Sequence, residues 1–177
     1  SELEEILKDL ERMIREVEDY LRKSNERLED VLRKVKKKLD EINDELRRVV
    51  EEVKKKLEDK GGKRELTEKI DRLLDDARRH SEELKKELDD LLRESRKHSE
   101  DLKRELRRLL DEVRRLLSQV DAEELKRRLE EIVKRARDLL KEHSDDNERL
   151  VERAERLVEE HRDKVRKIVE ELEEEVR

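Results

Sequence analysis

The chain has 177 residues, of which 59% are charged, with 49 Lys and Arg against 55 Asp and Glu and a formal net charge of -6. It contains no Cys, Pro, Trp or Phe, which excludes disulfides and zinc–thiolate sites, and its apolar residues occur in runs of at most two, too short to span a bilayer. Acidic and basic residues are mixed at short range, which is typical of solvated helix surfaces and argues against nucleic-acid binding.

Two breaks divide the chain into three predicted helices. The first break, "DKGGK" at 59–63, holds both glycines of the chain, and glycine after a helical run is the usual terminator. The second lies within 117–125, where Asp121 can cap the next helix and Glu124, three residues later, can complete a capping box. The sequence therefore predicts helices near 2–60, 64–118 and 122–176, each on the order of 80 Å long.

Apolar residues recur at intervals of eighteen along each predicted helix, as in the column Leu10, Leu28 and Leu46. Eighteen residues make about five helical turns, so each column stays on one line of a straight helix, whereas a heptad repeat would impose a supercoil. Roughly seven positions in eighteen are apolar, enough for three faces to close around one core. We therefore expect an all-α fold, a straight up-down-up three-helix bundle, with residues 1–177 forming one domain in a single chain.

Polar residues interrupt the core columns at the same interval of eighteen. They are Asn25 and Asn43 in the first helix, His80 and His98 in the second, and His143 and His161 in the third. Residues at equal height in an antiparallel hairpin have numbers with a constant sum. Asn25 with His98 and Asn43 with His80 both give 123, while His98 with His143 and His80 with His161 both give 241, so both centres fall on the two breaks. The sequence predicts two layers, Asn25/His98/His143 and Asn43/His80/His161, roughly 27 Å apart.

Other small polar residues accompany these layers. The predicted network partners of the histidines are Asn25, Asn43, Ser24, Ser81, Ser95, Ser99, Ser144 and Asn147. A neutral imidazole offers one donor and one acceptor, and Asn offers both, so a ring of hydrogen bonds across three helices is feasible. Because an unpaired buried polar group costs a few kcal/mol, we expect the pairing to be nearly complete.

The four histidines are the predicted pH-sensing residues. A buried neutral His has a pKa below its unfolded value of about 6.5, because desolvation disfavours the imidazolium. The unfolded chain then binds more protons, so acid should destabilise or open the bundle. Two alternatives stay open. The layers could only fix helix register in a static, hyperstable scaffold or assembly component, or the histidines could lie at the surface.

Other chemistry finds little support in the sequence. Two His and one Asn per layer fall short of the three or four good ligands that zinc needs, so we expect no metal and no cofactor. The stretch "HSD" at 143–145 contains the residue types of a catalytic triad, but adjacent residues of a helix point in different directions. No Gly-rich phosphate loop is present. We expect no catalytic residue, no enzyme activity and no small-molecule substrate.

The idealised repeats, absent prolines, minimal loops and polar layers at matched heights resemble those of de novo designed helical bundles with buried histidine hydrogen-bond networks, a pH-responsive class. The resemblance covers the whole chain, and its specific part is the two layers of His80, His98, His143, His161, Asn25 and Asn43. It implies a synthetic origin with no natural compartment. Members of the class are often symmetric oligomers, but three non-identical helices in one chain favour a monomer.

The resemblance also implies a partner, since some members of that class were intended to disrupt membranes in acid. Each predicted helix here carries a long apolar stripe, and such a stripe, once released from the core, can lie in a lipid interface. Acid also moves the net charge of -6 toward positive, which favours contact with anionic lipid. A lipid membrane at acidic pH is therefore the one external partner that the sequence suggests, and aggregation of the opened chains is the alternative outcome.

Overall fold

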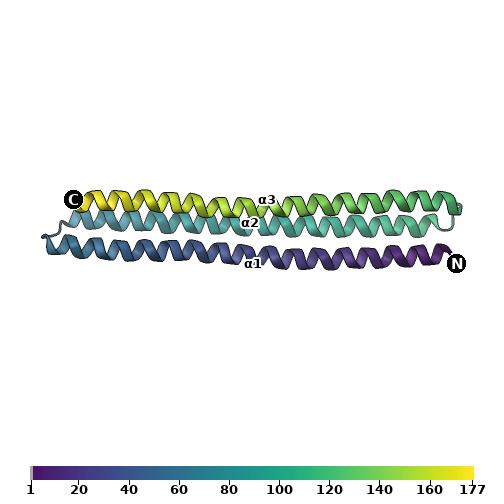
Figure 1. The fold of residues 1–177 in the computed structure, drawn as a ribbon, viewed down its shortest axis with the longest axis horizontal. Coiled ribbons are helices and arrows are strands. Elements are labelled where there is room, and N and C mark those ends of the chain that lie inside the picture. The colour runs from purple at the N-terminus through teal and green to yellow at the C-terminus, as the bar shows by residue number, and fades with distance from the viewer. Residues whose placement is uncertain (1) are drawn as a thin grey trace. The chain divides into compact units, whose positions relative to one another are not determined.

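A computed structural model describes residues 2–177 of the chain, and Ser1 lies outside the described residues. Its helices are α1 at Glu2–Asp59, α2 at Arg64–Leu116 and α3 at Ala122–Val176, joined by two short connections (Figure 1). No strand occurs between residues 2 and 177. The predicted all-α three-helix bundle is confirmed, although α2 ends two residues earlier than its expected limit of 118.

Local chemistry sets the helix ends at both breaks. Gly61 has a φ of 82°, a left-handed conformation that favours glycine, and its N–H donates to the carbonyl of Glu58 at 3.1 Å. At the second break, the Asp121 carboxylate accepts a hydrogen bond from the backbone N–H of Glu124 at 2.8 Å. Asp121 is therefore the N-cap of α3, as its residue type and position predict.

Contacts within the chain define two compact units, and each unit contains a segment of every helix. Unit 1 comprises residues 2–29 and 92–150 of the described chain, and unit 2 comprises 30–91 and 151–177. Each predicted polar layer falls wholly within one unit. Unit 1 contains Asn25, His98 and His143, whereas unit 2 contains Asn43, His80 and His161.

Within each unit, α1 and α2 run antiparallel in one register. Ion pairs join Glu18 to Arg107 in unit 1 and Asp40 to Lys85 in unit 2, and in both pairs the residue numbers add to 125. A constant sum is what antiparallel neighbours require. The α2–α3 ion pairs Glu105–Arg135 and Glu87–Arg153 likewise share a sum of 240. The helices of each unit are therefore arranged up, down and up.

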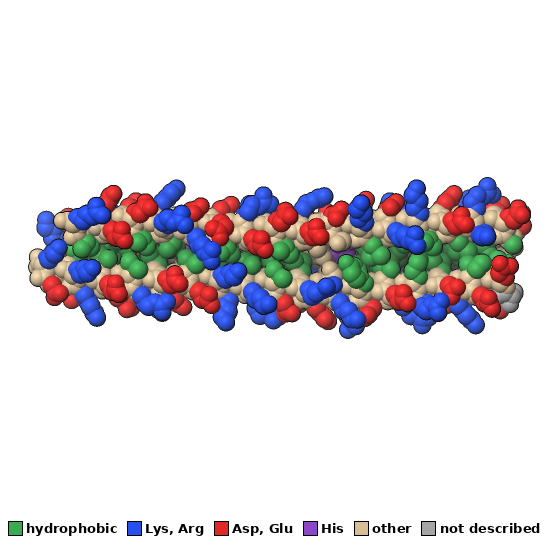
Figure 2. Space-filling model, viewed as in Figure 1, with side chains coloured by type: hydrophobic (Ala, Val, Ile, Leu, Met, Phe, Trp, Pro, Cys, Tyr) green, Lys and Arg blue, Asp and Glu red, His purple; other side chains and the backbone are tan. Residues whose placement is uncertain are grey.

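Both units have cores of aliphatic side chains on the columns that repeat every eighteen residues. In unit 1, Leu21, Leu106 and Leu125 are fully buried, and in unit 2 the same is true of Leu39, Leu88 and Leu157, among others. Burying each such side chain contributes about 1.5–3 kcal/mol. Figure 2 shows one face, on which acidic and basic side chains cover the helices and apolar side chains lie between them. No helix within residues 2–177 combines the length and apolar character that crossing a bilayer requires.

Candidate functional site: two polar layers

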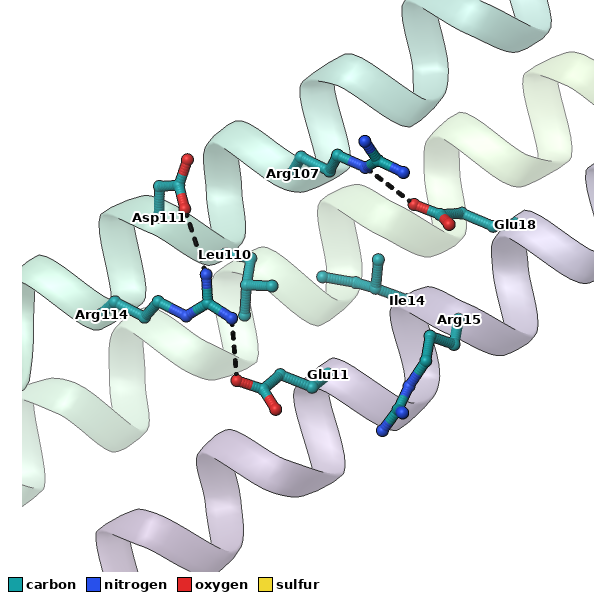
Figure 3. A pocket seen from close by; sticks show the side chains of 8 residues that line it. All are labelled: Glu11, Ile14, Arg15, Glu18, Arg107, Leu110, Asp111 and Arg114. Carbon is teal, nitrogen blue, oxygen red and sulfur yellow. Dashed lines mark hydrogen bonds and ion pairs between the residues drawn. The ribbon is translucent and has the colours of Figure 1, made fainter.

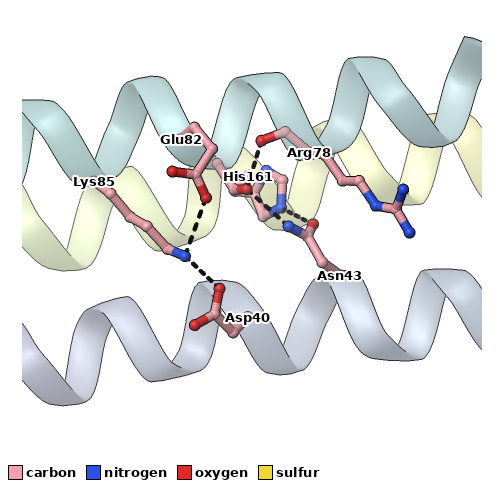
Figure 4. Close-up of polar contacts among 7 residues, drawn as sticks. Asp40, Asn43, Arg78, Glu82, Lys85 and His161 are labelled. Atoms are coloured by element: carbon pink, nitrogen blue, oxygen red, sulfur yellow. Dashed lines mark hydrogen bonds and ion pairs between the residues drawn. The ribbon is translucent and has the colours of Figure 1, made fainter.

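The polar layer of unit 2 consists of Asn43, His80, Ser81 and His161. Nδ1 of His80 lies 3.0 Å from Nδ1 of His161, and Nε2 of His161 lies 2.6 Å from Oδ1 of Asn43. Nδ2 of Asn43 donates to Oγ of Ser81 at 2.7 Å, and the Ser81 hydroxyl donates to the backbone carbonyl of Arg78 at 2.8 Å (Figure 4). The layer is therefore one continuous chain of hydrogen bonds that joins α1, α2 and α3.

Acceptor and donor identities fix where the protons of this chain lie. Because Oδ1 of Asn43 can only accept, Nε2 of His161 carries a proton and donates it. In a neutral ring, Nδ1 of His161 is then the acceptor, so Nδ1 of His80 donates to it. All the hydrogen bonds therefore donate in the same direction along the chain, from His80 through His161, Asn43 and Ser81 to the carbonyl of Arg78. Two neutral histidines satisfy the whole layer.

Burial dominates the electrostatics of this layer. The side chain of His161 is 0% exposed, and burial, followed by the charges of His80 and Lys164, lowers its pKa from 6.5 to about 4. Burial and Lys164 also lower the pKa of half-buried His80, whereas Glu83 and Glu160 act in the opposite direction. The two rings stack with centroids 5.2 Å apart and an interplanar angle of 24°. The neutral form of His161 is therefore strongly favoured in the folded state.

The polar layer of unit 1 consists of Ser24, Asn25, Ser95, His98, Ser99, His143 and Asn147. Nδ2 of Asn25 donates to Oγ of the buried Ser99 at 3.0 Å. Separately, Ser95 donates to Oδ1 of Asn147 at 2.8 Å, and Nδ2 of Asn147 donates to Ser24 at 3.0 Å. These two short chains cross between helices without including either histidine. The predicted Asn25/His98/His143 ring does not form.

The two histidines of unit 1 occupy different environments. His143 is only 5% exposed, and neither of its buried ring nitrogens has a hydrogen-bond partner among residues 2–177, which is also true of Oδ1 of Asn25. His98 has a side chain that is 51% exposed, with Nδ1 3.9 Å from Asp146 and Nε2 3.9 Å from Glu94. The expectation that all four rings lie inside the bundle therefore fails at His98. Its ring lies outward, beside two carboxylates that can pair with an imidazolium.

Two pockets border His143 and His98. One, of about 230 Å³, is also lined by Ser95, Asp146 and Asn147. The other, of about 140 Å³, also starts at the two rings and extends along α2 and α3 in the direction opposite to the first pocket. Burial lowers the pKa of His143, the charge of Asp146 acts to raise it, and His98 lowers it. Both rings of this layer therefore border open pockets, and the unpaired nitrogens of His143 cost free energy.

The observed α1–α2 register explains why neither predicted ring contains a bond between Asn and the histidine of α2. In both units, Asn lies opposite the serine that follows His, as in Asn25–Ser99 and Asn43–Ser81, rather than opposite the histidine itself. The predicted α2–α3 register holds for His80 and His161, which are in direct contact. Ser144, another predicted partner, is half-buried and is not among the hydrogen-bonded members of either layer within residues 2–177.

Sequence reasoning missed the charged neighbours of the histidines and the carbonyl of Arg78. Lys164 acts on both rings of unit 2, and Asp146 acts on His143 in unit 1. The sequence does contain a signal for this difference in charge between the layers. Asp146 and Lys164 are eighteen residues apart, as His143 and His161 are, so they occupy equivalent positions beside the two histidines.

Other candidate sites are weaker. Across residues 2–177, no three His, Asp or Glu side chains are grouped so that they could hold a metal ion. A surface groove of about 430 Å³ in unit 1 has Ile14 and Leu110 among its lining residues. The Arg107–Glu18 and Arg114–Glu11 ion pairs bridge it at 3.1 and 3.0 Å (Figure 3). Such exposed pairs contribute little free energy, about 0–1 kcal/mol each.

Comparisons with known proteins add little to this geometry. The chain matches no known family and no curated protein. One matching solved structure is titled "Computationally designed three helix bundle". That chain is 18% identical, and the match covers 99% of this chain and 92% of the other, with a TM-score of 0.46.

Proposed function

We propose that this chain is a designed protein whose stability falls in acid because its buried histidines must be neutral in the folded state. Its three-helix fold contains a buried His–Asn hydrogen-bond network, in which His161 contacts both His80 and Asn43. The eighteen-residue repeat and the paired histidines support a designed origin. The folded unit is proposed to be a single chain, since three non-identical helices are already joined covalently.

The full burial of His161 carries the proposal. Its side chain is 0% exposed, and one of its nitrogens must accept a hydrogen bond from His80. Protonation of that nitrogen would remove the acceptor and place a cation inside the core. Both effects oppose the charged form, in agreement with the lowered pKa of about 4.

The pH window follows from proton linkage. The unfolded chain binds a proton at His161 below about pH 6.5, whereas the folded chain does so only near pH 4. Between these values the unfolded state holds more protons, so the free energy of unfolding falls as the pH falls. Stability is full above about pH 6.5. His161 alone accounts for a loss of about 2 kcal/mol between pH 6.5 and pH 5.

Denaturant unfolding at several pH values tests this function. We expect the guanidinium chloride midpoint of the parent chain to fall between pH 7.5 and pH 5. A variant with His80, His98, His143 and His161 all replaced by Asn is the control, and its midpoint should be nearly constant over that range. A parent midpoint that does not change, or that changes equally in the control, would rule out histidine-dependent acid sensing and favour the static scaffold.

Membrane perturbation is a second proposal, which depends on the first. The apolar stripes of α1, α2 and α3 are buried in the core, as with Leu46, Leu106 and Leu157. If acid separates the helices, these stripes become free to enter the interface of an anionic membrane. Dye release from anionic liposomes should then rise below pH 6 with the parent chain and not with the quadruple His-to-Asn variant. Equal release from both would contradict this proposal.

A further inference from the structure

The bond between His80 and His161 joins two nitrogens of the same type, Nδ1 to Nδ1, at 3.0 Å. An N–H···N hydrogen bond has room for one proton, because one nitrogen must present its lone pair. This limit does not depend on the orientation of the Asn43 amide. If the amide oxygen and nitrogen exchanged places, the bonds between Asn43, His161 and His80 would reverse, and the two Nδ1 atoms would still share one proton.

The pair nevertheless has a free place for one additional proton. With both rings neutral, the protons lie on Nδ1 of His80 and Nε2 of His161, and Nδ1 of His161 accepts. The remaining basic nitrogen is Nε2 of His80, on the side of this half-buried ring away from the shared bond. A proton there makes His80 cationic and breaks no hydrogen bond. A charged donor also strengthens its bond to His161.

The groups around the pair allow one positive charge. Glu83 on α2 and Glu160 on α3 favour charge on His80, while Lys164 on α3 opposes it. On the α1 side, Asn43 is neutral, and Asp40 is held by Lys85 at 2.5 Å. One cation on the half-buried ring therefore faces nearby carboxylates of opposite charge.

A second proton has no such place. It would have to bind Nδ1 of His161, where the Nδ1–H of His80 already points. Two N–H groups would then face each other, and two cations would lie with ring centroids 5.2 Å apart, one of them fully buried. The bond between the two Nδ1 atoms must then break. The hydrogen bonds of Asn43 and Ser81 depend on the position of the His161 ring, so they are disturbed as well.

We propose that the His80–His161 pair is a two-step proton sensor, which takes its first proton at His80 with the layer closed and opens when a second proton reaches His161. The proposal rests on the proposed function and adds to it, because it gives the order of the two protonation steps and assigns the opening of the layer to the second proton.

Side-chain NMR of the ¹⁵N-His-labelled parent chain tests both steps during acidification. We expect the His80 ring to show two protonated nitrogens while the signals of His161 remain those of a neutral ring and the folded-state spectrum persists. The coupling across the Nδ1–H···Nδ1 bond should remain until the unit 2 signals are lost. If both rings stay neutral until the fold is lost, or both become cationic within an intact fold, the two-step sensor is wrong.

Proton counting separates this proposal from the proposed function. A His98→Asn/His143→Asn variant leaves the pair as the only histidines, and the quadruple variant supplies the background. Below about pH 6.5, where the histidines of the unfolded chain take up protons, the unfolding equilibrium constant should rise by up to about a hundredfold per unit fall in pH while both rings of the folded chain are neutral, and by about tenfold once His80 is charged. A steady hundredfold rise until the fold is lost overturns the two-step sensor and leaves acid sensing intact. If the equilibrium constant rises no more than it does in the quadruple variant, both the two-step sensor and the proposed acid sensing are wrong.

Discussion

A step of eighteen residues along each helix relates the unit 1 layer to the unit 2 layer, so that Asn25 corresponds to Asn43 and His143 to His161. The two layers nevertheless differ in hydrogen bonding. His161 is paired at both ring nitrogens, whereas His143, which is also buried, is paired at neither within the described part of the chain. Since the histidines and their direct partners are the same residue types, the cause must lie in their neighbours.

Several neighbouring positions differ between the layers, and three of them are apolar in unit 2 and polar in unit 1. Where unit 2 has Ile42, Ala77 and Val165, all buried, unit 1 has Ser24, Ser95 and Asn147. The three polar side chains of unit 1 bond one another and leave His143 out.

A further difference is a reversal of charge, since Asp146 takes the place of Lys164. A carboxylate 3.9 Å from His98 favours an outward ring that can pair with it in the solvent. A lysine near His80 offers no such attraction, and that ring remains beside His161. The surroundings of a buried histidine thus decide whether it joins a network.

The largest expected contrast comes from replacing one buried histidine at a time with leucine. His161→Leu should destabilise the chain by about 2–5 kcal/mol at pH 7.5, because Oδ1 of Asn43 and the Nδ1–H of His80 lose their partners. His143→Leu should be neutral or stabilising by up to about 2 kcal/mol, because it removes two unpaired buried nitrogens. Guanidinium chloride unfolding of both variants measures the contrast, and equal destabilisation would contradict the described difference between layers.

An intermediate effect is expected from giving unit 1 the neighbours of unit 2. The variant Ser24→Ile/Ser95→Ala/Asn147→Val/Asp146→Lys should let His98 turn inward and bond to His143, with a gain of about 1–3 kcal/mol from apolar burial. A crystal structure of the variant would show the rings directly. The single change Asp146→Lys is its control. If His98 stays outward in the full variant, neighbours do not explain the difference.

The smallest effect is expected from the charges alone. Lys164→Asp should raise the pKa of His161 from about 4 toward 6.5, because a cation that opposes imidazolium becomes an anion that favours it. The acid-dependent loss of stability should then shrink by less than about 1 kcal/mol. The reverse change, Asp146→Lys, should lower the pKa of His143. Titration of the ring signals by NMR measures both, and shifts of the opposite sign would contradict the assigned roles.

Much of the fold was predictable from the sequence because its signals are local or periodic. Gly61 and Asp121 mark helix ends through their own backbone and side-chain chemistry. The interval of eighteen places residues at equal heights, since a helix rises a fixed 1.5 Å per residue. That rule brought His80 and His161 together correctly.

Tertiary structure decided which groups at one height bond to each other. The α1–α2 register places Asn43 opposite Ser81 instead of His80, a difference of one residue that spacing does not resolve. The outward ring of His98 depends on Asp146, which lies on a different helix. A hydrogen bond requires two atoms within about 3 Å and a suitable angle, so small changes in helix position and side-chain rotamer determine whether it forms. Sequence spacing therefore fixed the heights of the polar residues, and packing between helices fixed their partners.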